Sequence, residues 1–122
     1  MMKHYVSWKD VKQFVNEVTS QFNGKVNGVY GLPRGGLVLA VMLSHRLNVP
    51  LLQGAFPGCL VVDDICDTGE SLIHYRKNSS GDKKGYTIAT MYYKKNELGI
   101  VPDYYMFEKN DSWIVFPWEG ED

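Results

Sequence analysis

Acidic and hydroxyl side chains gather in residues 63–71, directly after the short apolar run 60–62. Two adjacent carboxylates come first, and a loop of mainly small polar residues follows: Asp63, Asp64, then Asp67, Thr68, Gly69, Glu70 and Ser71. A glycine, two hydroxyls and the free N–H groups of a helix start form a cradle for a phosphate monoester. The acidic pair suits the hydroxyls of a sugar and, through water, a magnesium ion. The spacing therefore predicts a site for a phosphorylated sugar.

A purely structural interpretation explains part of this loop. Asp67 can cap the helix expected to begin near Leu72, with Glu70 three residues later as its capping-box partner. It leaves Asp63 and Asp64 unexplained, because adjacent like charges at a strand end are costly unless a cation or hydroxyl is bound. We therefore favour ligand binding.

A second loop with an anion-binding composition lies earlier in the chain. Residues 31–36 read Gly-Leu-Pro-Arg-Gly-Gly and separate a predicted strand from a predicted helix. Gly35 and Gly36 let backbone N–H groups face an anion, and Arg34 adds a planar guanidinium suited to phosphate oxygens. Taken alone, this composition is equally consistent with an ordinary turn between strand and helix.

Both loops need strands that end at the same edge of a sheet. The apolar runs 26–30 and 60–62 predict short buried strands, each followed by a helix. In open α/β sheets, ligands bind beyond the carboxyl ends of such strands. We therefore expect an α/β fold with three α/β/α layers, in which these two strands lie side by side in a mainly parallel sheet.

The remaining elements follow from hydrophobic periodicity and turn residues. A capping box at Ser7 predicts a helix that ends at Asn23-Gly24. Further elements are predicted along the chain: strands at 51–52, 86–93 and 104–107, a helix at 37–47 and a polar surface loop at 77–85. The tail 113–119 is too aromatic to stay free, so it must pack on the protein or offer a surface for base stacking.

Length and composition limit the function further. The 122 residues, 44% of them hydrophobic, suit a single α/β domain over 1–122. A formal net charge of −1 gives no basic field for nucleic acid, and no apolar stretch is long enough to cross a membrane. Cys59 and Cys66 lack metal-ligand spacing and are predicted to be buried thiols, so we expect a reducing, cytoplasmic setting.

Residues 60–71 closely resemble the signature with which type I phosphoribosyltransferases bind 5-phosphoribosyl pyrophosphate (PRPP). The likeness extends over nearly the whole chain and most closely follows the bacterial xanthine-guanine phosphoribosyltransferases. Residues 33–36 resemble the family's pyrophosphate loop, and residues 117–119 resemble its Pro-Trp-Asp. The resemblance implies a phosphoribosyltransferase-like fold, Mg²⁺ as cofactor, PRPP and a purine base as ligands, and a homo-oligomer.

The resemblance also implies roles for single residues. Asp67 is expected near the purine N7 as catalytic proton acceptor, and Lys94 at the purine O6. Trp113 is expected to stack on the base, with backbone groups at Ile114 on the base edge. The two loops and the acidic pair are expected to bind PRPP or a nucleotide, through Arg34, Gly35, Gly36, Asp63, Asp64, Asp67, Thr68, Gly69, Glu70 and Ser71. Magnesium is expected at Asp63 and Asp64, through water.

The segment before residue 60 departs from the family pattern. Family members carry a long flexible hood there, which closes over PRPP and excludes water. Here only residues 53–58 remain between the predicted strand at 51–52 and Cys59. We therefore expect the antiparallel edge strand beside the hood to be reduced or absent. Related enzymes also imply a cis peptide between Pro33 and Arg34.

The function predicted on these grounds is purine salvage. A phosphoribosyl group passes from PRPP to a 6-oxopurine (guanine, xanthine or hypoxanthine), and pyrophosphate is released. The alternative is a catalytically weak regulatory protein of the same fold that binds PRPP or a nucleotide. An enzyme for a pyrimidine base is disfavoured by Lys94 and Trp113.

Overall fold

The strand β3 (Leu60–Cys66) is the centre of the protein in a computed structural model that describes residues 2–78 and 85–120. It pairs in parallel with β2 (Val29–Gly31) on one side and with β4 (Thr87–Tyr93) on the other. β5 (Tyr104–Glu108) pairs in parallel with β4 and completes a sheet of order β2-β3-β4-β5. The expected parallel sheet, with the two loop-bearing strands side by side, is confirmed.

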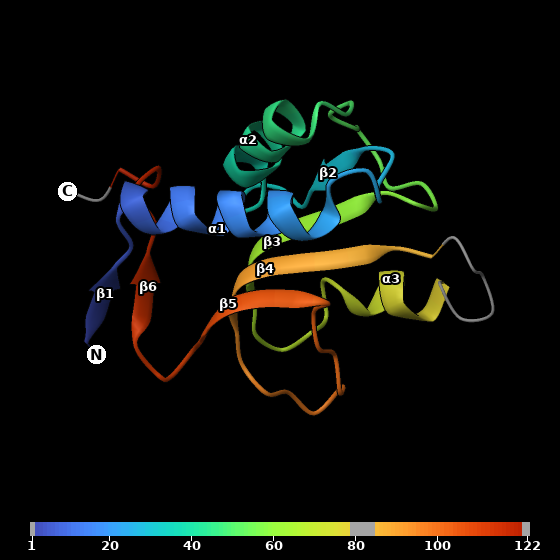
Figure 1. The fold of residues 1–122 in the computed structure, drawn as a ribbon. Coiled ribbons are helices and arrows are strands. Elements are labelled where there is room, and N and C mark those ends of the chain that lie inside the picture. The colour runs from blue at the N-terminus through green and yellow to red at the C-terminus, as the bar shows by residue number, and fades with distance from the viewer. Residues whose placement is uncertain (1, 79–84, 121–122) are drawn as a thin grey trace.

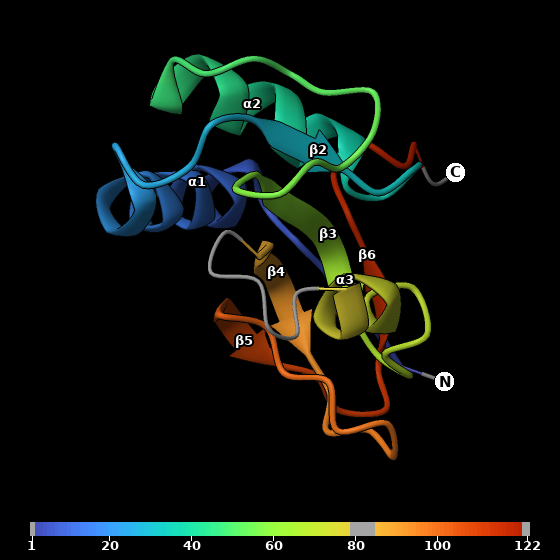
Figure 2. The ribbon, with the colours of Figure 1, turned by 90° about the vertical axis from the view of Figure 1, so that its right-hand side faces the viewer.

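Helices cover both faces of this sheet. α1 (Trp8–Phe22) and α2 (Leu37–Leu47) lie on one face, and α3 (Ile73–Asn78) lies on the other (Figures 1 and 2). Val62 of β3 belongs to the larger core cluster on the side of α1 and α2, whereas Val61 belongs to a smaller cluster on the α3 side. Alternate residues of β3 are thus buried on opposite faces, which explains its continuous apolar run.

The two long helices start where their sequence signals predict. At α1, the Asp10 N–H donates to the Ser7 hydroxyl over 3.1 Å, and the Ser7 N–H donates back to the Asp10 carboxylate over 3.4 Å. This is the predicted capping box. α2 covers the predicted residues and ends at Asn48, whose φ of 54° is left-handed. None of the helices among the described residues is long and apolar enough to span a membrane.

A second sheet is an element that the sequence patterns do not predict. In it, β1 (Lys3–Tyr5) pairs in parallel with β6 (Trp113–Val115). The pairing is extended at both ends by 2.8 Å hydrogen bonds, from the Trp113 N–H to the Met2 carbonyl and from the Val6 N–H to the Val115 carbonyl. Beyond β6 the chain returns to the core, where Phe116 is buried and stacks on Trp118. Phe116 and Trp118 of the aromatic tail therefore pack on the protein, one of the two expected outcomes.

Two predicted strands are wrong in extent. β2 lacks residues 26–28, because the Asn27 N–H instead donates to the carbonyl of Gly58, in the segment before β3 (3.1 Å). The strand expected at 51–52 is a single bridge between Leu51 and Val29, since the chain leaves the sheet at once. Every strand pair within the described residues is parallel, in agreement with the expected loss of the antiparallel edge strand.

The loop predicted at 77–85 lies mostly outside the described residues, which omit 79–84. Its first two residues belong to α3, so the predicted start of that loop is too early. Cys59 and Cys66 are buried free thiols, as predicted. Burial raises the pKa of the Cys66 thiol to about 11, so this thiol stays protonated at neutral pH.

Candidate functional site

The loop after β3 encloses a small polar cavity of about 100 Å³, whose lining includes Asp67, Thr68, Gly69 and Ser71. Within the described part of the chain, the backbone N–H groups of Thr68, Gly69 and Ser71 donate to no protein group. The Thr68 hydroxyl accepts from the Glu70 N–H over 3.3 Å, which tightens the turn. Unpaired N–H groups around a small cavity are suited to an anion.

Gly69 is required for a reason that the sequence does not reveal. Its φ is +85°, and a Cβ at this position would lie 3.0 Å from both the Asn96 side-chain oxygen and the Ile100 side chain. Glycine at this position therefore lets the turn pack against residues 96–100, and the expectation that it also leaves room for an anion stays a prediction. Asn96 fixes that segment, because its side chain exchanges two 2.9 Å hydrogen bonds with the Ile100 backbone.

Glu70, the unusual carboxylate in this loop, does not line the small cavity. It is exposed and lines a neighbouring groove together with Lys95 and Glu97. A carboxylate turned away from an anion site does not repel the anion at contact distance.

The loop after β2 borders a second and larger cavity. This cavity has a volume of about 510 Å³ and is lined by Arg34, Gly35, Asp64, Trp118 and Glu119. Gly35 packs so closely on β3 that a Cβ there would overlap the Asp64 carboxylate. The peptide between Pro33 and Arg34 is cis, as the family resemblance implies.

Gly36 holds the turn rather than facing the cavity. It is buried, its N–H donates to the Leu32 carbonyl over 2.8 Å, and a Cβ there would overlap the Val62 carbonyl oxygen. Gly36 thus sets the path of the loop, whereas Arg34 and Gly35 border the open space.

Asp63 and Asp64 form a partly buried acidic pair at the carboxyl end of β3. The Asp63 carboxylate accepts from the Asp64 N–H, and the Asp64 carboxylate accepts from the Ile65 N–H, each over 2.8 Å. Burial, with the charge of Asp64, raises the pKa of Asp63 to about 8. Burial also raises the pKa of Asp64, to which the charge of Glu119 adds. A bound cation would offset this unfavourable arrangement of negative charge.

The acidic pair fits a magnesium site that is completed by a ligand. Magnesium prefers oxygen donors and is commonly held by one or two carboxylates, water and substrate phosphates. Within residues 2–78 and 85–120 there is no cluster of three or more carboxylate, histidine or cysteine side chains that could hold a metal alone. The two carboxylates lie beside two loops of anion-binding composition, so they suit a magnesium ion held jointly by the protein and by the phosphates of a ligand.

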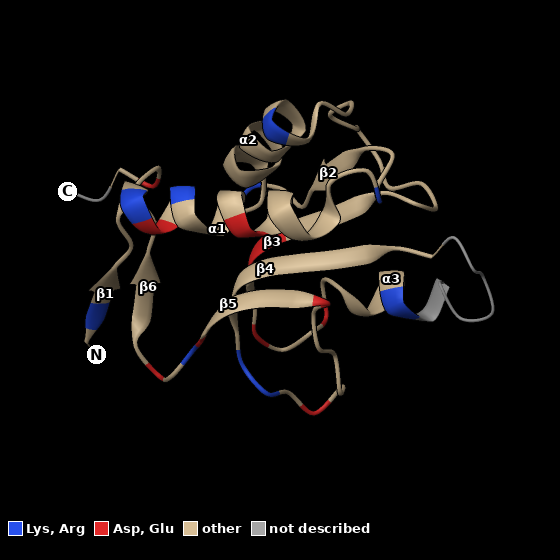
Figure 3. Ribbon diagram, in the orientation of Figure 1, with Lys and Arg blue, Asp and Glu red and all other residues tan. Residues whose placement is uncertain are grey.

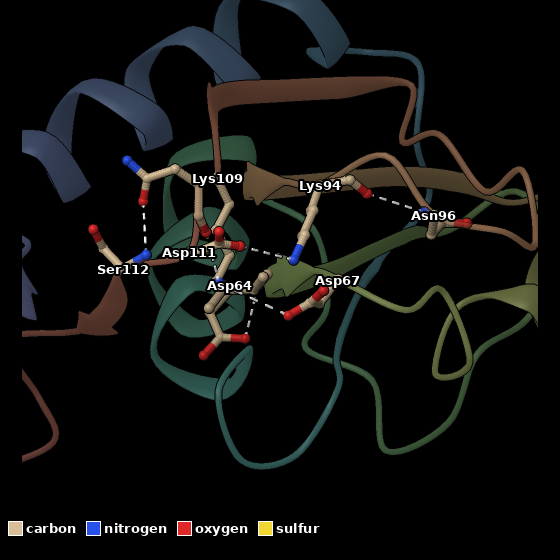
Figure 4. Close-up of polar contacts among 9 residues, drawn as sticks. Asp64, Asp67, Lys94, Asn96, Lys109, Asp111 and Ser112 are labelled. Carbon is tan, nitrogen blue, oxygen red and sulfur yellow. Dashed lines mark hydrogen bonds and ion pairs between the residues drawn. The ribbon is translucent and has the colours of Figure 1, made fainter. Parts of the chain in front are cut away.

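Lysine and acidic residues both lie in the segments that follow β3, β4 and β5 (Figure 3). The Lys94 backbone N–H donates to the Cys66 carbonyl over 2.8 Å, so the backbone of Lys94 lies beside the start of the loop that contains Asp67. Its ammonium lies 3.5 Å from the Asp111 carboxylate, as Figure 4 shows, and its side chain is 41% exposed. Lys94 is therefore paired and accessible rather than buried.

The two other predicted base-binding residues lie in β6. Trp113 is 58% exposed, so it does not serve as core cover and its ring is accessible to a ligand. Ile114 is buried, and its side chain lines a cavity of about 420 Å³ together with Tyr92 and Lys109. The segment between β5 and β6 links these residues to Lys94 through Asp111.

Three side chains near the site have no assigned role from the sequence. Lys109 lies 3.9 Å from the Asp67 carboxylate, while Trp118 and Glu119 line the larger cavity. The likeness of residues 117–119 to Pro-Trp-Asp is a signal for Trp118 and Glu119. No local pattern marks Lys109, because its position depends on how β5 pairs with β4.

A solved structure shares both this fold and a substantial part of this sequence. The purine phosphoribosyltransferase from Pyrococcus horikoshii Ot3 has a TM-score of 0.79 and is 30% identical, over 100% of this chain and 97% of that one. The chain belongs to the type I phosphoribosyltransferase family. No family model matches it.

Two further comparisons agree with this phosphoribosyltransferase assignment. The xanthine-guanine phosphoribosyltransferase of Idiomarina loihiensis is 25% identical over 94% of this chain and 86% of its own length. The Helicobacter pylori xanthine-guanine-hypoxanthine phosphoribosyltransferase has the same fold, with a TM-score of 0.73 and 21% identity over 97% of this chain and 94% of its own. The phosphoribosyltransferase likeness therefore includes both loops and the tail.

Proposed function

We propose that this protein transfers the phosphoribosyl group of PRPP to a 6-oxopurine base and releases pyrophosphate. One observation carries the proposal: two loops of anion-binding composition flank a partly buried acidic pair at one edge of the sheet. PRPP carries one phosphate and one pyrophosphate on a sugar with two free hydroxyls, so it needs this combination of groups. The names of the curated relatives support a purine as acceptor.

Each loop has a separate role in binding PRPP. The unpaired N–H groups of Thr68, Gly69 and Ser71 receive the 5′-phosphate, and the backbone around Gly35 with the Arg34 guanidinium receives the pyrophosphate. Asp63 and Asp64 bind the ribose hydroxyls and hold magnesium through water. Bound magnesium supplies positive charge to the pyrophosphate oxygens.

The acceptor base is held at the ends of β4 and β6. Lys94 donates to the purine O6, Trp113 stacks on the ring and the backbone at Ile114 meets the base edge. The exposure of the Trp113 ring and the position of Lys94 beside the Asp67 loop support these roles. A base with an amino group at C6 offers a donor where Lys94 needs an acceptor, so adenine is rejected.

The residues act mainly by positioning the reactants and stabilising charge. The bond between C1′ and the pyrophosphate oxygen breaks, and its electron pair leaves with pyrophosphate. The purine N9 lone pair forms the new bond to C1′, while Asp67 accepts the proton from N7. Arg34 stabilises the negative charge that develops on the leaving group.

A steady-state assay tests the proposal. The protein, PRPP and Mg²⁺ are mixed with guanine, xanthine, hypoxanthine or adenine, and pyrophosphate release and nucleotide formation are both measured. We expect base-dependent turnover with the three 6-oxopurines and little with adenine. Binding of PRPP without base-dependent pyrophosphate release refutes the enzyme.

A PRPP- or nucleotide-binding regulator is the second candidate. It is favoured by the short segment 53–58, which leaves no long hood to close over the larger cavity. The same assay separates the two functions, because a regulator binds PRPP in calorimetry and forms no nucleotide with any base.

A further inference from the structure

Lys109 occupies a fixed position at the end of β5. Its N–H donates to the Tyr93 carbonyl over 2.7 Å, which carries the pairing of β4 and β5 one residue beyond Glu108. Its side chain is only 13% exposed, and its ammonium donates to the Asn110 carbonyl over 3.0 Å. The backbone and the side chain of Lys109 are thus both held in place.

The ammonium of Lys109 faces the proposed proton acceptor. It lies 3.9 Å from the Oδ2 atom of Asp67, whose side chain is 49% exposed (Figure 4). This separation is too long for a hydrogen bond, so the contact is an electrostatic attraction between two charged groups. A lysine with so little solvent around it depends on such a neighbour more than an exposed lysine does.

Lys94 provides a contrast at the same edge. Its side chain is 41% exposed and its partner Asp111 is 99% exposed, so solvent screens this pair. Exposed pairs contribute little and exchange readily. Lys94 is therefore free to leave Asp111 for a ligand, whereas Lys109 keeps its position beside Asp67.

We propose that Lys109 is a positioning residue that orients the Asp67 carboxylate for proton transfer from the purine, an inference that rests on the proposed function. Asp67 lies on an exposed loop and has no hydrogen bond that holds its side chain among the described residues. The charge of Lys109 attracts Oδ2 of Asp67 and leaves Oδ1 turned toward the purine held at the ends of β4 and β6. The proton passes from N7 to Oδ1 while N9 bonds to C1′ and the electron pair of the broken bond leaves with pyrophosphate.

Charge-removing and charge-keeping variants test this role. Lys109→Gln retains an amide that can donate to the Asn110 carbonyl but loses the charge, and Lys109→Arg keeps the charge. We expect Lys109→Gln to lower kcat about tenfold or more with an unchanged KM for PRPP, because only the geometry of proton transfer is affected. Lys109→Arg should recover most of kcat. Lys95→Met, which removes an exposed lysine near the same edge, is the matched control and should keep wild-type kcat.

A double-mutant cycle with Asp67→Asn decides whether Lys109 acts through Asp67. In the Asp67→Asn background, Lys109→Gln should produce no further loss of kcat. Multiplying losses, or a wild-type kcat in Lys109→Gln, would overturn the positioning role while leaving the proposed function intact. If the wild-type protein forms no nucleotide with any purine, the proposed function fails and this inference fails with it.

Discussion

At the scale of single residues, the acidic pair is the feature with the strongest physical signature. Asp63 and Asp64 are adjacent, partly buried and bonded to neighbouring backbone N–H groups. Because the pKa of Asp63 is raised to about 8, its ionisation opposes folding. In the absence of a bound cation, the free energy of unfolding is therefore expected to fall as pH rises from about 4 to about 8. A cation bound at the pair should reduce this loss.

Asp63→Asn should remove this pH dependence. The amide oxygen can still accept from the Asp64 N–H, but it carries no charge. At pH 8.5 without Mg²⁺ the variant should melt about 4 °C or more above the wild type, and the difference should shrink toward pH 5. Thermal unfolding over this range measures the effect.

Asp111→Asn, at a fully exposed carboxylate, is the control and should show no such trend. A constant difference across pH would argue against the burial of a charged Asp63.

Base selection tests two further single residues. Lys94→Met should reduce the preference for guanine over adenine about tenfold, because the donor to O6 is lost. Trp113→Ala should instead weaken binding of all bases alike, because stacking does not depend on the ring substituents. Values of kcat/KM for each base measure both effects. An unaltered preference in Lys94→Met would remove this lysine from base recognition.

At the scale of elements, each loop is shaped by what packs beneath it. The turn at Gly69 rests on the segment fixed by Asn96, and the turn at Gly35 rests on the Asp64 carboxylate. Glycine at these two positions therefore reflects close approach within the protein, and it couples each loop to a strand end. In the loop after β2, this contact joins the proposed pyrophosphate site to the acidic pair.

Gly35→Ala tests that coupling. The added methyl group would overlap the Asp64 carboxylate, so either the loop or the carboxylate must move. We expect binding of PRPP with Mg²⁺ to weaken about tenfold or more in calorimetry, with the helix content unchanged. Gly54→Ala is the matched control, because a Cβ at Gly54 meets no atom within 4 Å. Equal affinity in the two variants would show that the contact with Asp64 is dispensable.

At the scale of the whole molecule, the first strand of the described chain pairs with the last. β1 holds β6 and hence Trp113, while the residues beyond β6 return to the cavity at Arg34. Trp113, the proposed base-stacking residue, is thus carried by a small sheet outside the four-stranded sheet (Figure 1). All three β1 side chains are exposed, so backbone pairing is the main contribution of this strand.

Removing residues 1–5 tests this arrangement. We expect the KM for guanine to rise severalfold while the KM for PRPP stays unchanged, because β6 loses its partner and Trp113 its fixed position. A full-length variant with Tyr5→Ser removes a largely exposed side chain, keeps the backbone and should behave as the wild type. An unchanged KM for guanine in the shortened chain would show that β6 holds its position without β1.

The sequence by itself determined that the two loop-bearing strands lie side by side in a parallel sheet, where the two loops lie and where α1 starts. These features depend on local signals: an apolar run, glycines beside an arginine, and a serine three residues before an acid. Residues 60–71 in particular carry strand, acidic pair and turn within one short stretch. Local residue types therefore predicted the two loops and the acidic pair of the candidate site, whereas the base-binding residues followed from the family resemblance.

Tertiary structure alone decided which distant groups meet. The parallel pairing of β1 with β6 joins residues over 100 positions apart, and the pairing of β5 with β4 brings Lys109 to Asp67. Gly69 faces Asn96 for the same reason. Such contacts depend on strand register and on the path of the chain between elements, and local residue types encode neither of them uniquely.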